Sequence, residues 1–296
     1  MKRILIIKNT ANSFESFIND RISQISNCEV LSTWSVYSNG RTAKDFYKCF
    51  RKCKSISQAE YDKIIVFDSY VIAFFLTILC RKTKVVLFFW NCISSTKRTL
   101  KRVMLHCLHA YTFDGNDANY YRLNLASQFH CFNEIDNEKK KIEHDLVFVG
   151  ANKDRLETLL QLDAFCKENT IKNKFIIVSE EIRIQNEIKN GGIHCSRWMD
   201  YLDVIDLTKK SSAILDIVHG GQIGMTMRVM EAIFFDKLLV TNNIEITKQP
   251  FYDKKNIFVI GIDNMKELKK FLSSGNAKYS QEIKDDFHIT HWIESF

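Results

Sequence analysis

Short apolar runs alternate along the chain with segments in which apolar residues recur every three or four positions. Residues 2–7 form the first such run and residues 13–25 the first segment with helical spacing, which predicts a strand followed by a helix. The alternation continues to a charged stretch at residues 134–143 and starts again at residue 146. Strands that alternate with helices in this way favour a parallel sheet covered by helices on both faces.

The predicted elements fall into two sets of similar layout, separated by the charged stretch. In the first set we expect strands at 2–7, 29–34, 63–67, 84–90 and 111–113 and helices at 13–25, 42–54, 70–79 and 95–109. In the second we expect strands at 146–149, 174–178, 213–218, 237–241 and 256–260 and helices at 153–167, 201–210, from Thr226, at 265–272 and at 281–296. This layout predicts an α/β fold with two Rossmann-like, doubly wound parallel-sheet domains at 1–140 and 141–280. A C-terminal helix at 281–296 could pack back across them.

Composition places the chain among folded globular proteins, with 46% hydrophobic and 26% charged residues. The net charge is +7, and most of the positive excess lies between Arg41 and Arg102. The helices predicted at 42–54 and 95–109 mix Lys and Arg with aromatic and aliphatic residues. Three interpretations of these helices are open: a solvated helix face, a surface that contacts anionic lipid, or a site that binds nucleic acid. The acidic second half and the lack of a known nucleic-acid-binding motif argue against nucleic acid.

The nine cysteines are scattered and include no paired CxxC motif. His-Cys dipeptides occur at 106–107, 130–131 and 194–195, but adjacent side chains point in different directions, so we predict no metal site. Scattered cysteines fit a reducing, cytosolic compartment. We expect no signal peptide, and the most hydrophobic run, 69–80, is too short to span a bilayer.

The residues 211–243, SSAILDIVHGGQIGMTMRVMEAIFFDKLLVTNN, carry the strongest binding pattern. A strand is followed by a loop with glycines at 220, 221 and 224, and then by a helix with Arg228 in its first turn and Glu231 three residues later. Glycines and the free N–H groups of a helix start favour a phosphate, and Arg228 lies where it could meet one. The alternative is an ordinary strand–loop–helix unit with solvated charges.

Other candidate residues follow the ends of predicted strands, where ligands of such sheets bind. They are Asn9, Asp68, Asn91 and Asp114 in the first half and Gly150, Ser179 and the loop at 220–226 in the second.

Several segments resemble bacterial glycosyltransferases of lipopolysaccharide and capsule assembly, which have the two-domain GT-B architecture. The segments are FVGANKDR (148–155), KKSSAILD (209–216), GQIGMTMRVMEAIFFDKLLVTNN (221–243) and FYDKKNIFVI (251–260). The first half matches by its layout and more weakly through TFDGNDANYYRLN (112–124). The resemblance implies two domains that face each other across a cleft, with a nucleotide-sugar donor in the second domain and an acceptor in the first.

The resemblance also implies roles for single residues. Arg228 would neutralise the donor diphosphate, and Glu231 would accept hydrogen bonds from ribose hydroxyls. Gln222, Gly224 and Thr226 would line the diphosphate or the sugar. Lys153 and Arg155 could reach the same phosphates or could belong to a solvated helix start.

Two positions depart from the family pattern and leave the stereochemistry open. Ile223 stands where retaining members carry a second glutamate, and Asn9-Thr10-Ala11-Asn12 replaces the glycine-rich turn after the first strand.

The chemistry implied is transfer of a sugar to a glycan acceptor, one that is lipid-linked if the basic helices contact the inner face of the membrane. Arg228 and the helix start would stabilise the leaving diphosphate. No Asp-x-Asp motif occurs and Asp200-Tyr-Leu-Asp203 has the wrong spacing, so no metal or other cofactor is expected. The alternatives are a non-catalytic protein that binds nucleotide sugars or nucleic acid, and a nucleotide-sugar epimerase.

An inverting transferase also needs a base for the acceptor hydroxyl. Asp68 and Asp114 are the candidates, and each could instead be a helix N-cap. Asp114 is preferred, because Gly115, Asn116 and Asp117 surround it with polar groups.

Overall fold

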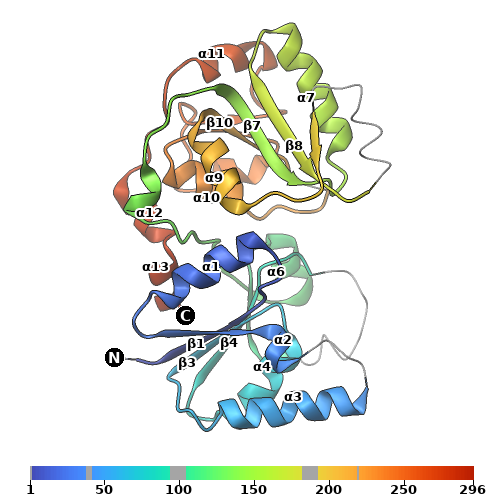
Figure 1. Ribbon diagram of the computed structural model, residues 1–296, viewed down its shortest axis with the longest axis vertical. Helices are drawn as coiled ribbons and strands as arrows, with labels where there is room; N and C mark the ends of the chain where they lie inside the picture. The colour runs from blue at the N-terminus through green and yellow to red at the C-terminus, as the bar shows by residue number, and fades with distance from the viewer. Residues whose placement is uncertain (1, 38–41, 94–104, 182–192, 219) are drawn as a thin grey trace. The chain divides into compact units, whose positions relative to one another are not determined.

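The computed structural model of the protein describes residues 2–37, 42–93, 105–181, 193–218 and 220–296 (Figure 1). The chain divides into two compact units. The first holds Met1–Cys131 and Trp292–Phe296, and the second holds Phe132–His291. Each unit has its own sheet and its own apolar core. Among the described helices, none has both the length and the hydrophobicity needed to cross a bilayer.

The first unit is built on a six-stranded parallel sheet with the order β2-β1-β3-β4-β5-β6. Its strands are β1 (Ile4–Lys8), β2 (Cys28–Ser32), β3 (Lys63–Phe67), β4 (Lys84–Phe89), β5 (His109–Thr112) and β6 (Asn124–Leu125). The helix α1 (Ser13–Ser23) covers one face, and α3 (Ala43–Ile56) and α4 (Tyr70–Leu79) cover the other (Figure 1). All residues of β1 are buried, as expected for a strand covered on both sides.

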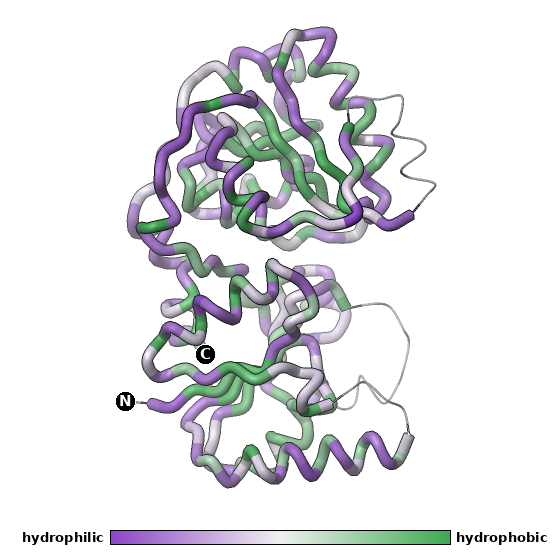
Figure 2. Tube along the Cα trace, viewed as in Figure 1, coloured by the Kyte–Doolittle hydropathy of each residue, from purple (hydrophilic) through white to green (hydrophobic). Residues whose placement is uncertain are grey.

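The second unit is built on another six-stranded parallel sheet, with the order β12-β11-β10-β7-β8-β9. Its strands are β7 (His144–Ala151), β8 (Asn173–Val178), β9 (His194–Ser196), β10 (Ser211–Asp216), β11 (Leu238–Thr241) and β12 (Ile257–Val259). The helix α7 (Leu156–Glu168) lies on the opposite side of this sheet from α9 (Tyr201–Lys209) and α10 (Met227–Phe234) (Figure 1). Figure 2 shows the hydrophobic residues concentrated along the strands.

Shorter elements complete the two units. They are α2 (Thr33–Val36), α6 (Gly115–Tyr121), α11 (Leu268–Leu272), α12 (Gln281–Asp286), α13 (Ile289–Glu294) and the 3₁₀ helices Glu134–Asn137, Ile244–Lys248 and Met265–Glu267.

The predicted fold of two doubly wound parallel sheets is confirmed, with local differences. The strand predicted at 29–34 ends at Ser32, and Thr33 begins a helical turn. The helix predicted at 281–296 is two helices, with a break at Phe287, whose ring packs edge-on against Phe251. Most of the helix predicted at 95–109 lies outside the described residues.

Each sheet has one point at which the strand order reverses, between β1 and β3 in the first and between β7 and β10 in the second. In doubly wound sheets such switch points are where ligands bind. The β1 and β3 strands stay paired up to Ile7 and Val66. The described pairing of β7 with β10 ends at Val147 and Ile214, whereas β7 stays paired with β8 as far as Ala151 and β10 stays paired with β11 as far as Asp216. The carboxyl ends of β7 and β10 are therefore not joined by strand pairing, and we call the position between them the notch.

The end of the chain is anchored in the first unit by Trp292, which is 2% exposed. Its ring lies edge-on to Phe88 and 4.6 Å, centroid to centroid, from Phe129. Its indole N–H donates to Ser127 O at 2.9 Å. A buried tryptophan whose polar atom is satisfied binds the terminal segment firmly to this sheet.

Candidate functional site

The notch between β7 and β10 is filled by Arg228, the second residue of α10. Its Nε donates to a carboxylate oxygen of Asp216 at 3.2 Å, and its Nη1 donates to Val149 O at 3.3 Å. The guanidinium also lies over the ring of Phe148. A Cβ at Gly150 would stand 3.0 Å from Nη1, so the glycine makes room for the guanidinium. The Nη2 group takes no part in these bonds, and the side chain is 15% exposed.

A second guanidinium, that of Arg155, enters the same notch from the β7 side. Its Nε donates to Ile217 O at 2.5 Å and its Nη1 to Ala151 O at 3.0 Å. Burial, and then the nearby charge of Arg228, lower the pKa of Arg155 to about 10, so the side chain stays protonated at neutral pH. The two arginines together satisfy backbone carbonyls at these strand ends, as buried carbonyls require.

The position of Arg155 depends on a tight turn in which Arg155 N donates to Asn152 O at 2.8 Å. The turn residues Lys153 and Asp154 have φ of 39° and 60°, in the left-handed region that favours glycine. The prediction that Lys153 begins a helix is therefore wrong, because such φ values are incompatible with helical backbone. Strained residues of this kind persist where the surrounding structure holds them, often at functional sites.

Asp216, the last residue of β10, is a site residue that the sequence did not indicate. It is fully buried, and it accepts hydrogen bonds from Arg228 Nε, from Thr226 Oγ1 at 2.8 Å and from Thr241 Oγ1 at 3.1 Å. A buried carboxylate needs such partners. The available signal was its place as the only charged residue of the strand SSAILD, directly before the glycine loop.

The glycine loop is held at both ends by two asparagines that follow β11. Asn242 accepts from Val218 N at 2.8 Å and donates to Val218 O, while Asn243 Nδ2 donates to Ile223 O at 3.1 Å. Gly221 has a φ of +86°, and a Cβ at Gly220 or Gly221 would meet no atom within 4 Å. The backbone at Gly220 and Gly221 therefore borders open space.

Thr226 caps the start of α10, because its hydroxyl oxygen accepts from Arg228 N at 3.2 Å while its hydroxyl hydrogen goes to Asp216. Gln222 lies in the loop itself, and its side-chain amide donates to Gly224 O at 3.4 Å. Ser179 follows β8, and its backbone N–H donates to Ser196 O at 2.9 Å. Each of these residues lies at or beside the carboxyl edge of the second sheet.

Glu231 lies one turn of α10 beyond Arg228 and is 5% exposed. The hydroxyl of Tyr201, the first residue of α9, donates to its Oε1 at 2.8 Å. Burial raises the pKa of Glu231 to about 7, although Tyr201 and the charge of Arg228 oppose the rise. The structure thus brings Gly150, Arg155, Thr226 and Arg228 together at the notch, with Glu231 on the same helix.

The two acidic candidates of the first unit have different surroundings. Asp68 follows β3 with a φ of 57°, and its carboxylate accepts from Trp90 N, Asn91 N and Asn91 Nδ2 at 2.9–3.2 Å. Burial raises its pKa. Asp114 is the N-cap of α6, since one of its oxygens accepts from Asn116 N and Asp117 N. Asp114 thus takes the capping role that the sequence left open.

Lys8, at the end of β1, is a buried cation that the sequence did not indicate. It is 1% exposed, its Nζ donates to Asn9 O at 3.3 Å, and it lies over the ring of Trp90. Burial lowers its pKa to about 8, while the negative charges of Glu15 and Asp68 oppose that change. Lys8 and Asp68 flank the switch point of the first sheet.

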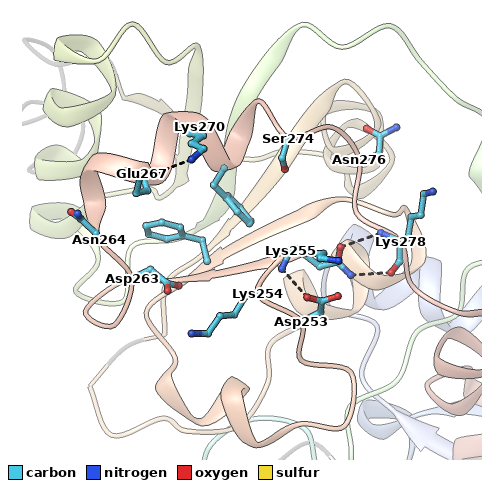
Figure 3. Close-up of a pocket in the computed structure, with 13 residues that line it drawn as sticks. Asp253, Lys254, Lys255, Asp263, Asn264, Glu267, Lys270, Ser274, Asn276 and Lys278 are labelled. Atoms are coloured by element: carbon cyan, nitrogen blue, oxygen red, sulfur yellow. Dashed lines mark hydrogen bonds and ion pairs between the residues drawn. The ribbon is translucent and has the colours of Figure 1, made fainter.

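A pocket of about 680 Å³ lies away from both switch points, between the loop before β12 and the helix α11 (Figure 3). Four lysines line it, but Lys254 and Lys278 extend in different directions, and Lys270 points to Glu267 (Figure 3). The lysines do not converge on one point, so this pocket has no centre of positive charge. Among the described residues, no group of three or more His, Cys, Asp or Glu side chains could hold a metal ion.

Comparison with solved structures finds the same architecture in sugar-processing enzymes. AviGT4, a glycosyltransferase of avilamycin A biosynthesis, is 12% identical with a TM-score of 0.66, over 100% of this chain and 96% of its own. A glycosyltransferase from Rickettsia africae is 11% identical with a TM-score of 0.62, over 99% and 96%. The UDP-GlcNAc 2-epimerase of Neisseria meningitidis, solved with UDP-GlcNAc, is 10% identical with a TM-score of 0.51, over the full length of both chains.

These likenesses establish the fold, which is the two-domain Rossmann-like GT-B fold. No protein-family model matches the sequence, and a comparison with curated proteins finds no match.

The raised pKa of Glu231 makes stability depend on pH. Between about pH 4.5 and 7 the carboxyl is ionised in the unfolded chain but protonated in the folded one, so stability falls as pH rises through this window. Glu231→Gln cannot ionise, so it removes the free-energy cost of a buried negative charge, and its side-chain oxygen can still accept a hydrogen bond from Tyr201. We expect the variant to exceed the wild type at pH 8 by on the order of 2–3 kcal/mol, and by much less at pH 4.5, in urea unfolding.

Glu157→Gln, at an exposed position of α7, is the matched control, and it should follow the wild type at both pH values. The raised pKa would be contradicted if the difference in unfolding free energy between Glu231→Gln and the wild type were the same at pH 4.5 and at pH 8.

Proposed function

We propose that the protein is a glycosyltransferase that moves a sugar from a nucleotide-sugar donor to a glycan acceptor. The observation that supports it most is the pair of guanidiniums in the notch of the second sheet. Arg155 and Arg228 bring two guanidiniums to this position, and the Asp216 carboxylate pairs with only one of them, Arg228. The excess positive charge lies beside the start of α10, whose helix dipole also favours an anion. A diphosphate matches this charge and this position.

In the proposed reaction, negative charge grows on the diphosphate as its bond to the sugar breaks. Arg228, already fixed by Asp216 and Val149 O, can stabilise that charge without reorganising. Lys153, Gln222 and Gly224 line the same edge of the sheet. Because the protein supplies the compensating cations, we propose that no metal or other cofactor takes part.

Glu231 has the proposed role of accepting hydrogen bonds from the ribose hydroxyls of the donor. Tyr201 holds one of its carboxylate oxygens, which fixes the direction of the other. Ser179 and Gly150 lie at neighbouring strand ends along the same edge.

UDP-GlcNAc 2-epimerases share the fold, so an epimerase is the second candidate. The bound UDP-GlcNAc of the Neisseria enzyme makes this nucleotide sugar the first donor to test. A transferase releases UDP only when it transfers the sugar to an acceptor or to water. An epimerase interconverts the sugar nucleotide with no acceptor and keeps UDP attached.

The protein can be incubated with an extracted glycan acceptor and, in turn, with each member of a panel of nucleotide sugars. We expect at least one nucleotide sugar to release free nucleoside diphosphate in this assay. Arg228→Ala should lower kcat/KM on the order of 100-fold or more, because an electrostatic contact to the leaving group is lost. Arg228→Lys keeps the charge and controls for folding, and Lys254→Ala removes a charge of the same unit outside the site. Interconversion of the donor without UDP release would favour the epimerase, and near-normal turnover of Arg228→Ala would refute the assigned role.

Of the two candidate bases for the acceptor hydroxyl, the surroundings favour Asp68. It lies at the switch point of the first sheet, in a left-handed backbone conformation, with a raised pKa that suits proton abstraction. We expect Asp68→Asn to lower kcat by 10²- to 10⁴-fold with little change in KM for the donor. Asp114→Asn preserves an N-cap and should keep kcat near the wild-type value. The reverse pattern in steady-state assays would assign the base to Asp114.

We further propose that the acceptor is lipid-linked, in the assembly of lipopolysaccharide or capsule, and that the protein works at the cytoplasmic face of the membrane. The support comes from α3, which exposes Phe46 and Tyr47 among Lys48, Arg51 and Lys52. Amphipathic aromatic side chains with cations suit an anionic lipid surface. The second basic segment, 95–109, lies mostly outside the described residues.

Vesicle sedimentation tests this surface. Phosphatidylglycerol vesicles should bind the protein, and binding should weaken as salt rises. Reversing two charges with Lys48→Glu and Lys52→Glu should weaken binding by about tenfold or more. The double variant Lys254→Glu and Lys255→Glu makes the same charge change in the second unit and should bind like the wild type. Equal binding to phosphatidylcholine would argue against a membrane role.

A further inference from the structure

The pocket of Figure 3 lies along the free edge of the second sheet. The strand order ends at β12, so this strand pairs on one side only, with β11. The pocket runs past its outer edge, from residues 253–256 before the strand to Asp263 and Asn264 after it (Figure 3). Its volume of about 680 Å³ is within the range of pockets that hold small ligands. The residues assigned above to the donor and to the acceptor base are not among those that line it.

The walls of the pocket are held together by internal contacts. Asn256 ties the start of β12 to the segment after α11, since its side-chain amide donates to Lys278 O at 2.9 Å and its side-chain oxygen accepts from Lys278 N at 3.3 Å. The ring of Phe258 in β12 also packs against the ring of Phe271 in α11, with the centroids 5.5 Å apart. A pocket whose walls are already fixed loses little conformational entropy when a ligand enters.

The edge of β12 is closed to an added strand. The strand bonds to β11 through Asn256 O and Ile260 N, so the N–H groups of Ile257 and Val259 face outward. Both are satisfied within the chain, because Ile257 N donates to Asp253 O at 2.9 Å and Val259 N donates to a carboxylate oxygen of Asp263 at 2.7 Å. A sheet edge whose donors are already used resists pairing with an extended peptide. The shape of the pocket therefore argues against a peptide ligand that binds as an extra strand.

The charges around the pocket have both signs and do not converge. Lys270 points to Glu267, with Nζ and a carboxylate oxygen 3.6 Å apart, and Lys254 and Lys278 extend in different directions (Figure 3). Two aspartates also belong to the lining. A phosphate would meet negative as well as positive groups here, and it gains most where cations converge on it. An uncharged ligand suits this lining better.

The lining offers hydrogen-bond donors and acceptors beside aromatic carbon. The side-chain oxygen of Asn264 accepts from Lys266 N at 3.1 Å, which leaves its amide N–H groups for a ligand. The side chains of Ser274 and Asn276 bond to no other residue in the described part of the chain. Gly275 stands between them with a φ of +104°, a turn conformation that favours glycine. Sugar hydroxyls both donate and accept, so a mixed lining of this kind matches a sugar.

We propose that this pocket binds a neutral oligosaccharide segment of the glycan acceptor, away from the point of transfer. The strand β12 lies two strands beyond β10, and adjacent strands are spaced by roughly 4.8 Å, so β12 ends about 10 Å from the notch. Asp263 lies at that end of the pocket, because it bonds to the last residue of β12. A glycan of a few sugar units spans this distance. The role of the bound segment rests on the proposed function, since it takes sugar transfer to occur at this edge of the sheet.

A second contact of this kind acts on long acceptors only. Once a glycan is bound in the pocket, its end meets the donor at an effective concentration set by the length of chain between the two places. A short acceptor cannot reach both places and gains nothing. The pocket thus makes kcat/KM rise with acceptor length until the glycan reaches from the transfer site to the pocket.

Calorimetry without a donor tests the pocket itself. The probes are neutral oligosaccharides cut from the extracted glycan, treated with phosphatase and separated by size, with inorganic pyrophosphate as the anionic comparison. The longer oligosaccharides should bind the wild-type protein. The double variant Ser274→Ala and Asn276→Ala should bind them on the order of 10-fold more weakly or worse, because two hydrogen bonds are lost at exposed positions. Lys254→Ala changes a lysine of the same pocket that the proposal does not use, and it should bind like the wild type.

Transfer assays with the same size series separate failure of the pocket from failure of the proposed function. The double variant should lose kcat/KM with the longest acceptors and keep it with the shortest. The proposal would be overturned if the double variant bound the oligosaccharides as tightly as the wild type, if the wild type bound none of them, or if pyrophosphate displaced them. Oligosaccharide binding that depends on Ser274 and Asn276, in a protein that transfers no sugar, would support the glycan pocket and refute the transferase.

Discussion

The second unit depends on one buried carboxylate, that of Asp216. Removing such a group from water costs several kcal/mol unless polar partners replace the water. Its partners here come from separate segments: Thr226 and Arg228 from the start of α10, and Thr241 from the end of β11. Satisfying this carboxylate therefore fixes the end of β10, the end of β11 and the entry to α10 relative to one another.

The lack of pairing between the ends of β7 and β10 creates a related demand, because it leaves strand-end carbonyls without ladder partners. Arg155 and Arg228 satisfy Ala151 O, Ile217 O and Val149 O, and doing so draws two positive charges to one edge of the sheet. The bonds that complete the backbone also orient the guanidiniums. A site whose charges are oriented by the fold is ready for an anion before the anion arrives, which is the property that electrostatic catalysis needs.

Local sequence patterns were sufficient to predict much of the fold and part of the candidate site. Strands that are covered on both faces consist of apolar residues, so most strands and the two-sheet fold could be predicted. The glycine loop marked the start of a helix, which placed Arg228 and Glu231 on one element. The notch could not be predicted, because it follows from which strands pair and where that pairing stops. Asp216 was missed for the same reason, since its partners are distant in sequence. The turn at Lys153 and Asp154 gave little signal, because only Asp154 is of a residue type enriched at positive φ, and lysine is not.

The two switch points differ in ways that bear on which substrate each would take. In the first sheet β1 and β3 remain paired up to Ile7 and Val66, one residue before the end of each strand. Lys8 is the buried cation among the described residues of this sheet; it lies over the ring of Trp90 and has a lowered pKa, whereas Asp68 supplies a carboxylate at the strand end. A diphosphate would meet less positive charge there than at the notch of the second sheet. A neutral hydroxyl, which needs an acceptor for its proton, suits the carboxylate better. The charge at each switch point thus agrees with the proposal of a donor site in the second unit and an acceptor site in the first.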